Sequence, residues 1–326
     1  MVASQLTHSS EPYAILCDGL KRRFGPTWAV SGVDLAVPEG MTYAFLGPNG
    51  AGKSTTIRML CTLLAPTEGH AFVGGYDVMD DPLDVRLRIG VALQSTALDD
   101  TQTGLESLQC QGRLYGLRKH EINRRVDELR ELIALDEALD RRVNTYSGGM
   151  RRRLDLAMAL VHNPRILFLD EPTTGLDPVS RMRLWEEVRR LNRERGITIF
   201  LTTQYLEEAD QLADRIGIID QGVIVADGTA EELKSGVGRD LVVAQISGDV
   251  AAARRALAGE PFTRSVEVLE DELTVSVDDG PAALSAVALA LSRVQSVEVR
   301  TITLRRPTLD DVFVSFTGHR MPAQQV

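Results

Sequence analysis

A glycine-rich segment at residues 47–54 most constrains how this chain can fold. It reads Gly-Pro-Asn-Gly-Ala-Gly-Lys-Ser, between an apolar strand-like run at 43–46 and a helix-like run at 55–60. In that setting, backbone N–H groups and the helix N-terminus favour phosphate. We expect Lys53 to neutralise phosphate oxygens and Ser54 to hold Mg²⁺. A glycine-rich turn without ligand is the alternative. The predicted nucleotide contacts are Gly47, Pro48, Asn49, Gly50, Ala51, Gly52, Lys53, Ser54 and Thr55.

Size and charge exclude several classes of protein. The 326 residues, 44% of them hydrophobic, suffice for one large and one smaller domain. A net charge of −10 argues against a protein that mainly coats nucleic acid, so no nucleic-acid partner is expected. The 3 cysteines lack metal-type spacing and fit a reducing cytoplasm. Without a signal core or a run of about 18 apolar residues, we expect a soluble chain that reaches a membrane only through a partner.

The order of strand-like and helical patterns predicts an α/β domain. Such patterns alternate between residues 13 and 227, and the runs beginning at Ile166 and Ile197 are apolar, as in strands covered on both faces. Residues 94–143 lack clear strands. They predict a helical subdomain, which we place at about residues 95–160. Gln221-Gly222 predicts a hairpin turn.

A composition shift at residues 234–238 predicts a linker, so the expected domains are residues 13–234 and 235–326. The second domain has the pattern strand, helix, strand, strand, helix, strand. That order is typical of a small ferredoxin-like α+β domain.

A strand at residues 166–170 ends in two neighbouring carboxylates, Asp170 and Glu171. Beside a phosphate loop, Asp170 is placed to reach Mg²⁺ through water. Glu171 is placed to orient or deprotonate an attacking water molecule. The alternative is an ordinary strand end with solvated acids.

Ser147, Gly148 and Gly149 precede a predicted helix at residues 150–160. A hydroxyl and two free amides at a helix start can bind an anion. An ordinary capped turn is the alternative, but the position shortly before the acidic strand favours an anion site. Three arginines at 151–153 open this helix and predict a solvated helix face, with contact to nucleotide or a partner as the alternative.

These ordered motifs resemble the nucleotide-binding subunit of ATP-binding-cassette (ABC) transporters, over about residues 13–230. The family signature, usually Leu-Ser-Gly-Gly-Gln, stands here as Tyr-Ser-Gly-Gly-Met. Gln94 matches the family's Q-loop, with an implied nucleotide and metal role, Asp177 its D-loop, and Phe24 its adenine-stacking aromatic. A strand cap, a helix cap and a packed core aromatic are the respective alternatives. The resemblance implies a P-loop NTPase fold that binds ATP with Mg²⁺ and hydrolyses ATP.

One position departs from the family pattern. Where the family places a histidine against the γ-phosphate, this chain has Gln204. The amide can donate a hydrogen bond to a phosphate oxygen but cannot become a cation near neutral pH. Either Gln204 positions the phosphate while Glu171 carries catalysis, or hydrolysis is slow and binding-driven closure does more of the work. We favour the first, with reduced turnover, because Lys53, Asp170 and Glu171 are intact.

The residues around Gln204 narrow the resemblance. Residues 201–210 and the tail 307–313 are similar to the daunorubicin-resistance group of exporter ATPases. This similarity implies a separate integral membrane permease subunit as partner and a hydrophobic drug-like cargo. It also implies a peripheral location at the cytoplasmic face of the cell membrane. The tail further predicts a helix that packs Leu309, Val312 and Phe313 on the small domain.

The resemblance also implies a homodimer. Two copies would clamp two ATP molecules head to tail, with Ser147 and Gly149 of one copy on the γ-phosphate held by the other. Non-transport members of the family are alternatives. Those in DNA repair carry long heptad-patterned inserts and those on ribosomes carry two cassettes per chain, and neither is seen in this sequence. A stand-alone phosphate-loop kinase would lack the Ser-Gly-Gly signature and Gln94.

Overall fold

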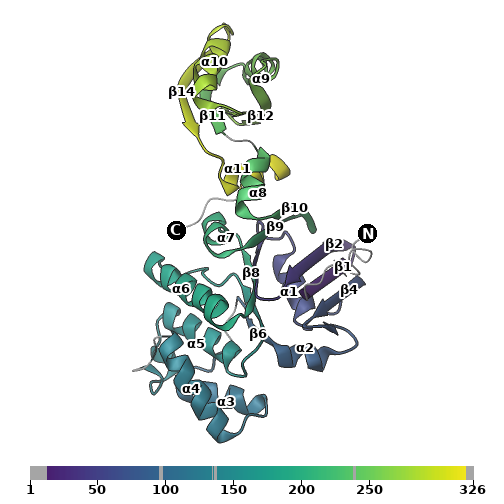
Figure 1. Ribbon diagram of the computed structural model, residues 1–326, viewed down its shortest axis with the longest axis vertical. Coiled ribbons are helices and arrows are strands. Elements are labelled where there is room, and N and C mark those ends of the chain that lie inside the picture. The colour runs from purple at the N-terminus through teal and green to yellow at the C-terminus, as the bar shows by residue number, and fades with distance from the viewer. Residues whose placement is uncertain (1–12, 95–97, 134, 136–137, 238–239, 321–326) are drawn as a thin grey trace. The chain divides into compact units, whose positions relative to one another are not determined.

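The computed structural model describes residues 13–94, 98–133, 135, 138–237 and 240–320 (Figure 1). Several predicted features extend outside these residues: the polar N-terminal segment 1–12, residues 95–97, 134 and 136–137 of the helical subdomain, and residue 238 of the linker. The chain divides into two compact units, residues 1–225 and 226–326. Within the described residues, no helix combines the length and apolar character needed to cross a bilayer.

A ten-stranded sheet organises the first unit, in the order β5-β4-β1-β2-β10-β9-β3-β8-β7-β6. Parallel pairing joins β6 to β7, β7 to β8, and β3 to both β8 and β9. The carboxyl ends of these strands meet at one edge, where open α/β sheets bind ligands. The strands are β1 (Tyr13–Phe24), β2 (Thr27–Pro38), β3 (Thr42–Leu46), β4 (Glu68–Val73), β5 (Tyr76–Asp77), β6 (Ile89–Ala92), β7 (Ile166–Asp170), β8 (Thr198–Thr203), β9 (Arg215–Asp220) and β10 (Val223–Gly228).

Strands β1 and β2 each span 12 residues but lack the regular alternation that predicts a strand from sequence. The two strands pair antiparallel, with register shifts between Cys17 and Leu20 and again between Leu20 and Arg22. Such irregularities break the two-residue alternation by which a half-buried strand is recognised. The burial of both Val30 and Val33, three residues apart on β2, shows the interruption.

The predicted helical subdomain is present within the first unit. Helices α3, α4 and α5 pack against one another (Figure 1). Helix α3 begins at a capping box in which Thr103 and Glu106 satisfy each other's backbone N–H groups. The helices of this unit are α1 (Lys53–Leu60), α2 (Pro82–Arg88), α3 (Gly104–Leu114), α4 (Lys119–Ile133), α5 (Gly148–Leu160), α6 (Pro178–Arg195) and α7 (Leu206–Leu212), with a 3-10 turn at Val143–Thr145.

The predicted hairpin turn at residues 221–222 is confirmed. Gln221 and Gly222 join β9 to its neighbour β10 and have φ angles of 47° and 82°. Two successive positive φ angles match the right-handed twist of the flanking strands.

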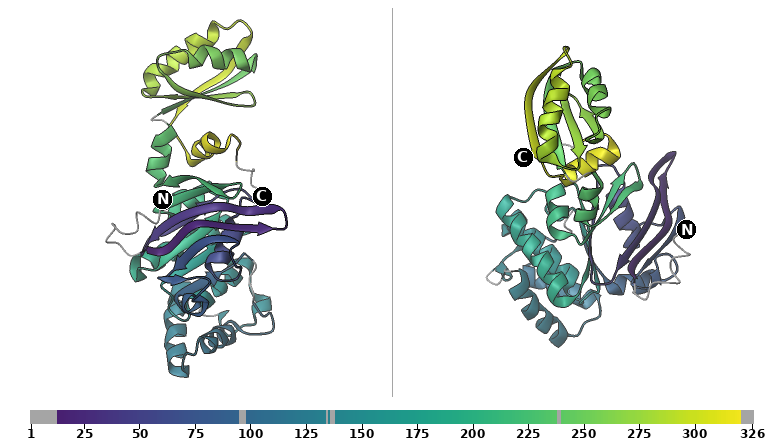
Figure 2. Two further views of the ribbon diagram at one scale, coloured as in Figure 1. Left: turned by 90° about the vertical axis from the view of Figure 1, so that its right-hand side faces the viewer. Right: turned by 45° about the horizontal axis from the view of Figure 1, so that its top comes forward.

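The second unit contains a four-stranded antiparallel sheet in the order β12-β13-β11-β14. Helices α9 and α10 cover one face of it (Figure 2). Its elements follow the β-α-β-β-α-β order of ferredoxin-like domains. All helices and strands described in this unit are α8 (Ala230–Val237), β11 (Asp240–Gly248), α9 (Val250–Ala258), β12 (Thr263–Leu269), β13 (Glu272–Val277), α10 (Gly280–Ser292), β14 (Val297–Arg305) and α11 (Leu309–Thr317).

Helices α8 and α11 flank this order in sequence. Helix α8 includes residues 234–237 of the segment predicted as a linker, so this part of the segment is helical. Helix α11 begins at a capping box of Thr308 and Asp311. It buries Leu309, Val312 and Phe313, as the sequence predicted for the tail.

Candidate active site

The glycine loop leaves β3 at Leu46 and opens helix α1. Gly47 donates its N–H to the Thr203 carbonyl oxygen at 3.1 Å, which ties the loop to the end of β8. A Cβ on Gly47 would lie 2.4 Å from the Ile219 carbonyl oxygen. Gly52 has a φ of +109°, and a Cβ there would lie 2.6 Å from the Ala29 carbonyl oxygen. Packing therefore requires glycine at positions 47 and 52 of the motif.

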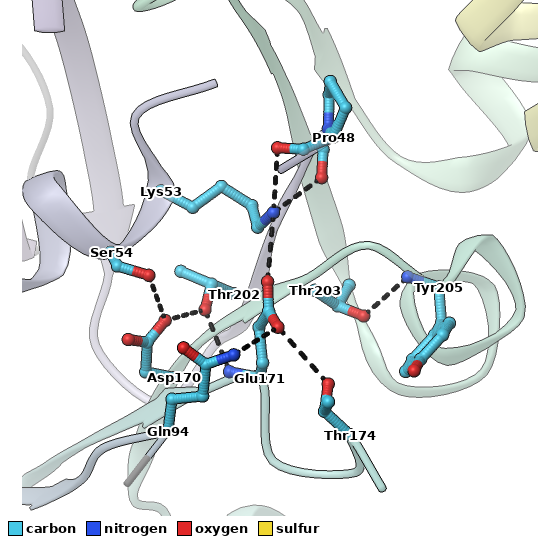
Figure 3. Close-up of polar contacts among 11 residues, drawn as sticks. Pro48, Lys53, Ser54, Gln94, Asp170, Glu171, Thr174, Thr202, Thr203 and Tyr205 are labelled. Atoms are coloured by element: carbon cyan, nitrogen blue, oxygen red, sulfur yellow. Dashed lines mark hydrogen bonds and ion pairs between the residues drawn. The ribbon is translucent and has the colours of Figure 1, made fainter. Parts of the chain in front are cut away.

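Lys53 is the buried cation of the site, with 4% of its surface exposed. Its Nζ donates to the carbonyl oxygens of Gly47 at 2.7 Å and Pro48 at 3.1 Å, and lies 3.2 Å from Glu171 Oε1 (Figure 3). Burial lowers the pKa of Lys53, while Glu171 and Asp170 oppose that shift. The ammonium group is therefore held within the loop where phosphate is expected.

Asp170 ends β7 and accepts hydrogen bonds from two hydroxyl groups. Its Oδ1 accepts from Ser54 Oγ at 3.1 Å and from Thr202 Oγ1 at 2.6 Å (Figure 3). The oxygen atoms of Ser54 and Asp170, beside a loop built for phosphate, fit Mg²⁺, which binds through one or two carboxylates and substrate phosphates. When bound, that ion would neutralise phosphate charge.

Glu171 lies one residue beyond the strand, at a φ of 47°. Its N–H donates to Thr202 Oγ1 at 3.0 Å, and its Oε2 accepts from Gln94 Nε2 at 3.2 Å and from Thr174 Oγ1 at 3.3 Å. A left-handed conformation in a residue other than glycine costs about 1–3 kcal/mol and is typical of functional sites. The structure thus brings Lys53, Gln94 and Glu171 into one hydrogen-bonded cluster (Figure 3).

Gln204 and Phe24 lie at the ends of two strands. Gln204 is half-buried directly after β8, next to Thr203, which bonds the phosphate loop. Phe24 ends β1 with 47% of its surface exposed, so the alternative of a packed core aromatic is wrong. The Arg22 guanidinium lies over the Phe24 ring, 4.7 Å from its centroid.

The Ser-Gly-Gly signature and Asp177 form a second cluster, on α5 and α6. Ser147 caps α5 by accepting from the Met150 N–H at 3.3 Å. Asp177 caps α6 and accepts from the N–H and Oγ of Ser180, at 3.0 and 2.6 Å, and these bonds lower the pKa of Asp177. A Cβ on Gly149 would lie 3.0 Å from Ser180 Oγ, so the two helix starts are adjacent. Ser147 and Gly148 are exposed.

Sequence reasoning missed Thr202 and mistook the environment of Arg152. Thr202 is fully buried and bonds both acidic residues. Arg152 is 8% exposed and donates to backbone carbonyls, so the predicted solvated face is wrong for this residue. Helical spacing could have found it, because Arg152 shares a face with the buried Leu156, four residues on. For Thr202 the signal was its place beside Asp170 in neighbouring strands, which only the pairing reveals.

Comparisons with known proteins find similar families for both units of the chain. The family described as ABC transporter matches residues 30–174, and the family described as ATP-binding protein DrrA1-3-like, C-terminal domain, matches residues 228–317. The daunorubicin resistance ATP-binding protein DrrA2 of Streptomyces coeruleorubidus is 47% identical over 314 residues, covering 94% of this chain and 96% of that protein. The doxorubicin resistance ATP-binding protein DrrA of Mycobacterium tuberculosis is 42% identical over 318 residues, covering 94% and 95%.

Solved structures resemble about two thirds of this chain. One is the dimeric structure of MJ0796, a bacterial ABC transporter cassette. It superposes with a TM-score of 0.60 at 26% identity, covering 66% of this chain and 98% of that one.

Proposed function

Because this chain belongs to the family of ABC transporter ATP-binding subunits and is an ATPase, we propose that it powers export of a hydrophobic, drug-like compound through a separate membrane permease subunit. The observation that carries this proposal is the extent of the likeness. Two relatives named for drug resistance are 47% and 42% identical over 94% of the chain, whereas a Nod factor export ATP-binding protein is 37% identical over 93%, and the DrrA1-3-like C-terminal family model matches residues 228–317 of the second unit.

The cluster at Lys53 supports the hydrolytic step. Residues 47–55 would bind the phosphates, and Ser54 and Asp170 would hold Mg²⁺. Lys53 and Glu171 form an ion pair of 3.2 Å, so phosphate oxygens would compete with Glu171 for the ammonium group. Loss of that partner frees the Glu171 carboxylate to accept a proton from water, with Gln94 and Thr174 still holding its other oxygen.

The second cluster supports a dimer in which each copy completes the other's site. Ser147 and the amides of Gly148 and Gly149 lie at the exposed start of α5, where a helix N-terminus favours an anion. The adjacent start of α6 would bring Asp177 to the same interface. A solved relative of 26% identity is itself described as dimeric. ATP would therefore be the bridge between two copies, and its hydrolysis would open them.

A groove in the first unit is our candidate for the membrane subunit. It has a volume of about 290 Å³ and is lined by Cys61, Leu63, Arg86, Ile89, Val91, Leu93, Tyr115 and Asp155. The groove reaches Leu93, which directly precedes Gln94. Its lining residue Leu63 is exposed, and so is Leu114, which directly precedes the lining residue Tyr115. A short helical segment of the permease with an apolar face would fit here and place this chain at the cytoplasmic face of the membrane.

The test is drug accumulation in a sensitive host that carries the chain and its membrane subunit, with daunorubicin as the probe. We expect lower accumulation with both proteins than with either alone, and no reduction with Glu171→Gln. Glu186→Gln, an exposed acid on α6, is the matched control and should export like wild type. Export that needs no ATP-hydrolysing chain, or co-sedimentation with ribosomes or DNA whether or not the membrane subunit is present, would contradict the proposal.

A further inference from the structure

Arg152 on α5 is a buried arginine that donates hydrogen bonds to the backbone on both sides of Glu171 and to the backbone of the residue before Gln94. Its Nε donates to the Pro172 carbonyl oxygen at 2.9 Å and its Nη2 to the Asp170 carbonyl oxygen at 3.0 Å. Its Nη1 donates to the Leu93 carbonyl oxygen at 2.5 Å and lies 3.3 Å from Asp155 Oδ2. One guanidinium group therefore joins the signature helix to the ends of β6 and β7.

The three carbonyl groups belong to the residues that surround the catalytic candidates. Leu93 directly precedes Gln94, while Asp170 and Pro172 flank Glu171. Gln94 and Glu171 are bonded to each other at 3.2 Å, a contact that depends on the placement of both loops. We propose that Arg152 is a positioning residue for ATP hydrolysis, which fixes the loops of Gln94 and Glu171 relative to each other from the helix that follows the signature.

The chemistry of arginine suits this role. The guanidinium group is planar and offers five N–H donors in a fixed arrangement, so it can hold three carbonyl oxygens at once. Burial lowers the pKa of Arg152, and Asp155 opposes that shift. Asp155 lies three residues on, so it provides the buried charge with a partner from the same helix. Lysine would supply donors but not their planar arrangement.

The chain contains a matched arginine away from the catalytic loops. Arg125 on α4 is 7% exposed and donates to the carbonyl oxygens of Val161 at 3.1 Å and Leu160 at 2.7 Å. It also pairs with Glu128, three residues on. Arg125 and Arg152 thus have the same burial, the same kind of partners and the same spacing to a carboxylate. They differ in which backbone segment they hold.

The experiment compares Arg152→Gln with Arg125→Gln in the full-length chain, by steady-state ATPase kinetics and ADP binding by calorimetry. We expect Arg152→Gln to lower kcat by about 10- to 100-fold, because small displacements of catalytic groups cost rates of that order. The ADP dissociation constant should change by less than about twofold. Arg125→Gln should lower thermal stability comparably but leave kcat within about twofold. If the two variants have equal kcat values at equal folded fraction, Arg152 has only a structural role and the proposal is wrong.

A second measurement separates positioning from general destabilisation. In a Glu171→Gln background, Arg152→Gln should cause almost no further fall in rate, because residues that act as a unit are not additive. A multiplicative fall would overturn the proposal. Should Arg152→Gln fail to fold, Arg152→Lys serves in both tests. Arg152→Lys should be faster than Arg152→Gln but slower than wild type. A rate equal to wild type would show that the planar guanidinium group is not needed.

Discussion

Two regions of this protein bury their side chains for different purposes. The carboxyl edge of the large sheet buries Lys53, Asp170 and Glu171, each 6% exposed or less, within one cluster of ion pairs and hydrogen bonds. The core cluster of the small unit is aliphatic, with Leu257 and Val287 among its fully buried members. Burying charge costs stability unless the charge is well paired, while burying aliphatic groups contributes stability directly. We therefore expect substitutions to affect activity at the edge and stability in the small unit.

Glu171→Gln should give the largest effect, a fall in ATPase rate of about 10²- to 10⁴-fold, the usual contribution of a general base. The change removes the charge but keeps the shape, so the hydrogen bond from Thr174 can persist. The measurement is phosphate release by the full-length chain at saturating Mg-ATP, with circular dichroism to verify folding. A rate within about twofold of wild type would remove Glu171 from the catalytic assignment.

Leu257→Ala in the small unit should instead lower stability. Leu257 is fully buried on α9, and truncating a buried leucine costs about 2–5 kcal/mol. The readout is hydrogen exchange of the β11 amides, which should become faster. All Trp and Tyr residues of the chain lie in the first unit, so tryptophan fluorescence follows the unfolding of that unit.

The control for this substitution is the fluorescence transition of Trp28 and Trp185, together with the ATPase rate. Both should match wild type, because the altered core belongs to the small unit. An equal loss in the fluorescence midpoint would show that the two units unfold together and would break the comparison.

The first unit should also lose stability in acid. In the first unit, burial lowers the pKa of His162 to about 4, and the neutral ring stacks on Tyr115 with centroids 3.6 Å apart. Between pH 6.5 and 4 the unfolded chain binds a proton at His162 that the folded chain does not. Stability therefore falls as pH decreases through that window, by up to about 3 kcal/mol. The fluorescence-detected urea midpoint should decrease accordingly, and His162→Phe should reduce the decrease.

Asp155 provides a control of opposite sign. Burial raises the pKa of Asp155 from its ordinary value of 3.8 to about 6. The folded chain therefore keeps a proton that the unfolded chain has lost, and this carboxyl destabilises the fold as pH rises from 3.8 to 6. Asp155→Asn should steepen the net loss of stability on acidification, whereas His162→Phe should flatten it. The same slope in both variants would refute the assignment.

The sequence predicted those parts of the fold and site whose signals are local. The glycine loop and the strands starting near Ile166 and Ile197 are uninterrupted patterns, and the structure contains all three. Strand β2 escaped prediction because register shifts disturb its alternation. Arg152 was mistaken for a solvated residue because three consecutive arginines suggest an exposed face, although the carbonyl groups that it binds come from distant segments.

Gln204 tests how much charge the nucleotide edge needs, and its expected effect is the smallest. It is half-buried after β8, at the position where the ABC transporter resemblance implies a histidine. Gln204→Ala removes a neutral hydrogen-bond donor. A hydrogen bond from such a donor to a charged acceptor contributes about 1.5–3 kcal/mol, so we expect the ATPase rate to fall by about 10-fold or more.

Gln204→His keeps a donor and allows a positive charge near neutral pH. If that variant exceeds wild type most at pH 6 and least at pH 8, the edge benefits from an added cation. If it equals wild type at both pH values while Gln204→Ala stays slow, the donor alone matters, and the charges of Lys53 and bound Mg²⁺ suffice for the phosphate. A rate of Gln204→Ala equal to wild type would exclude a catalytic role for Gln204.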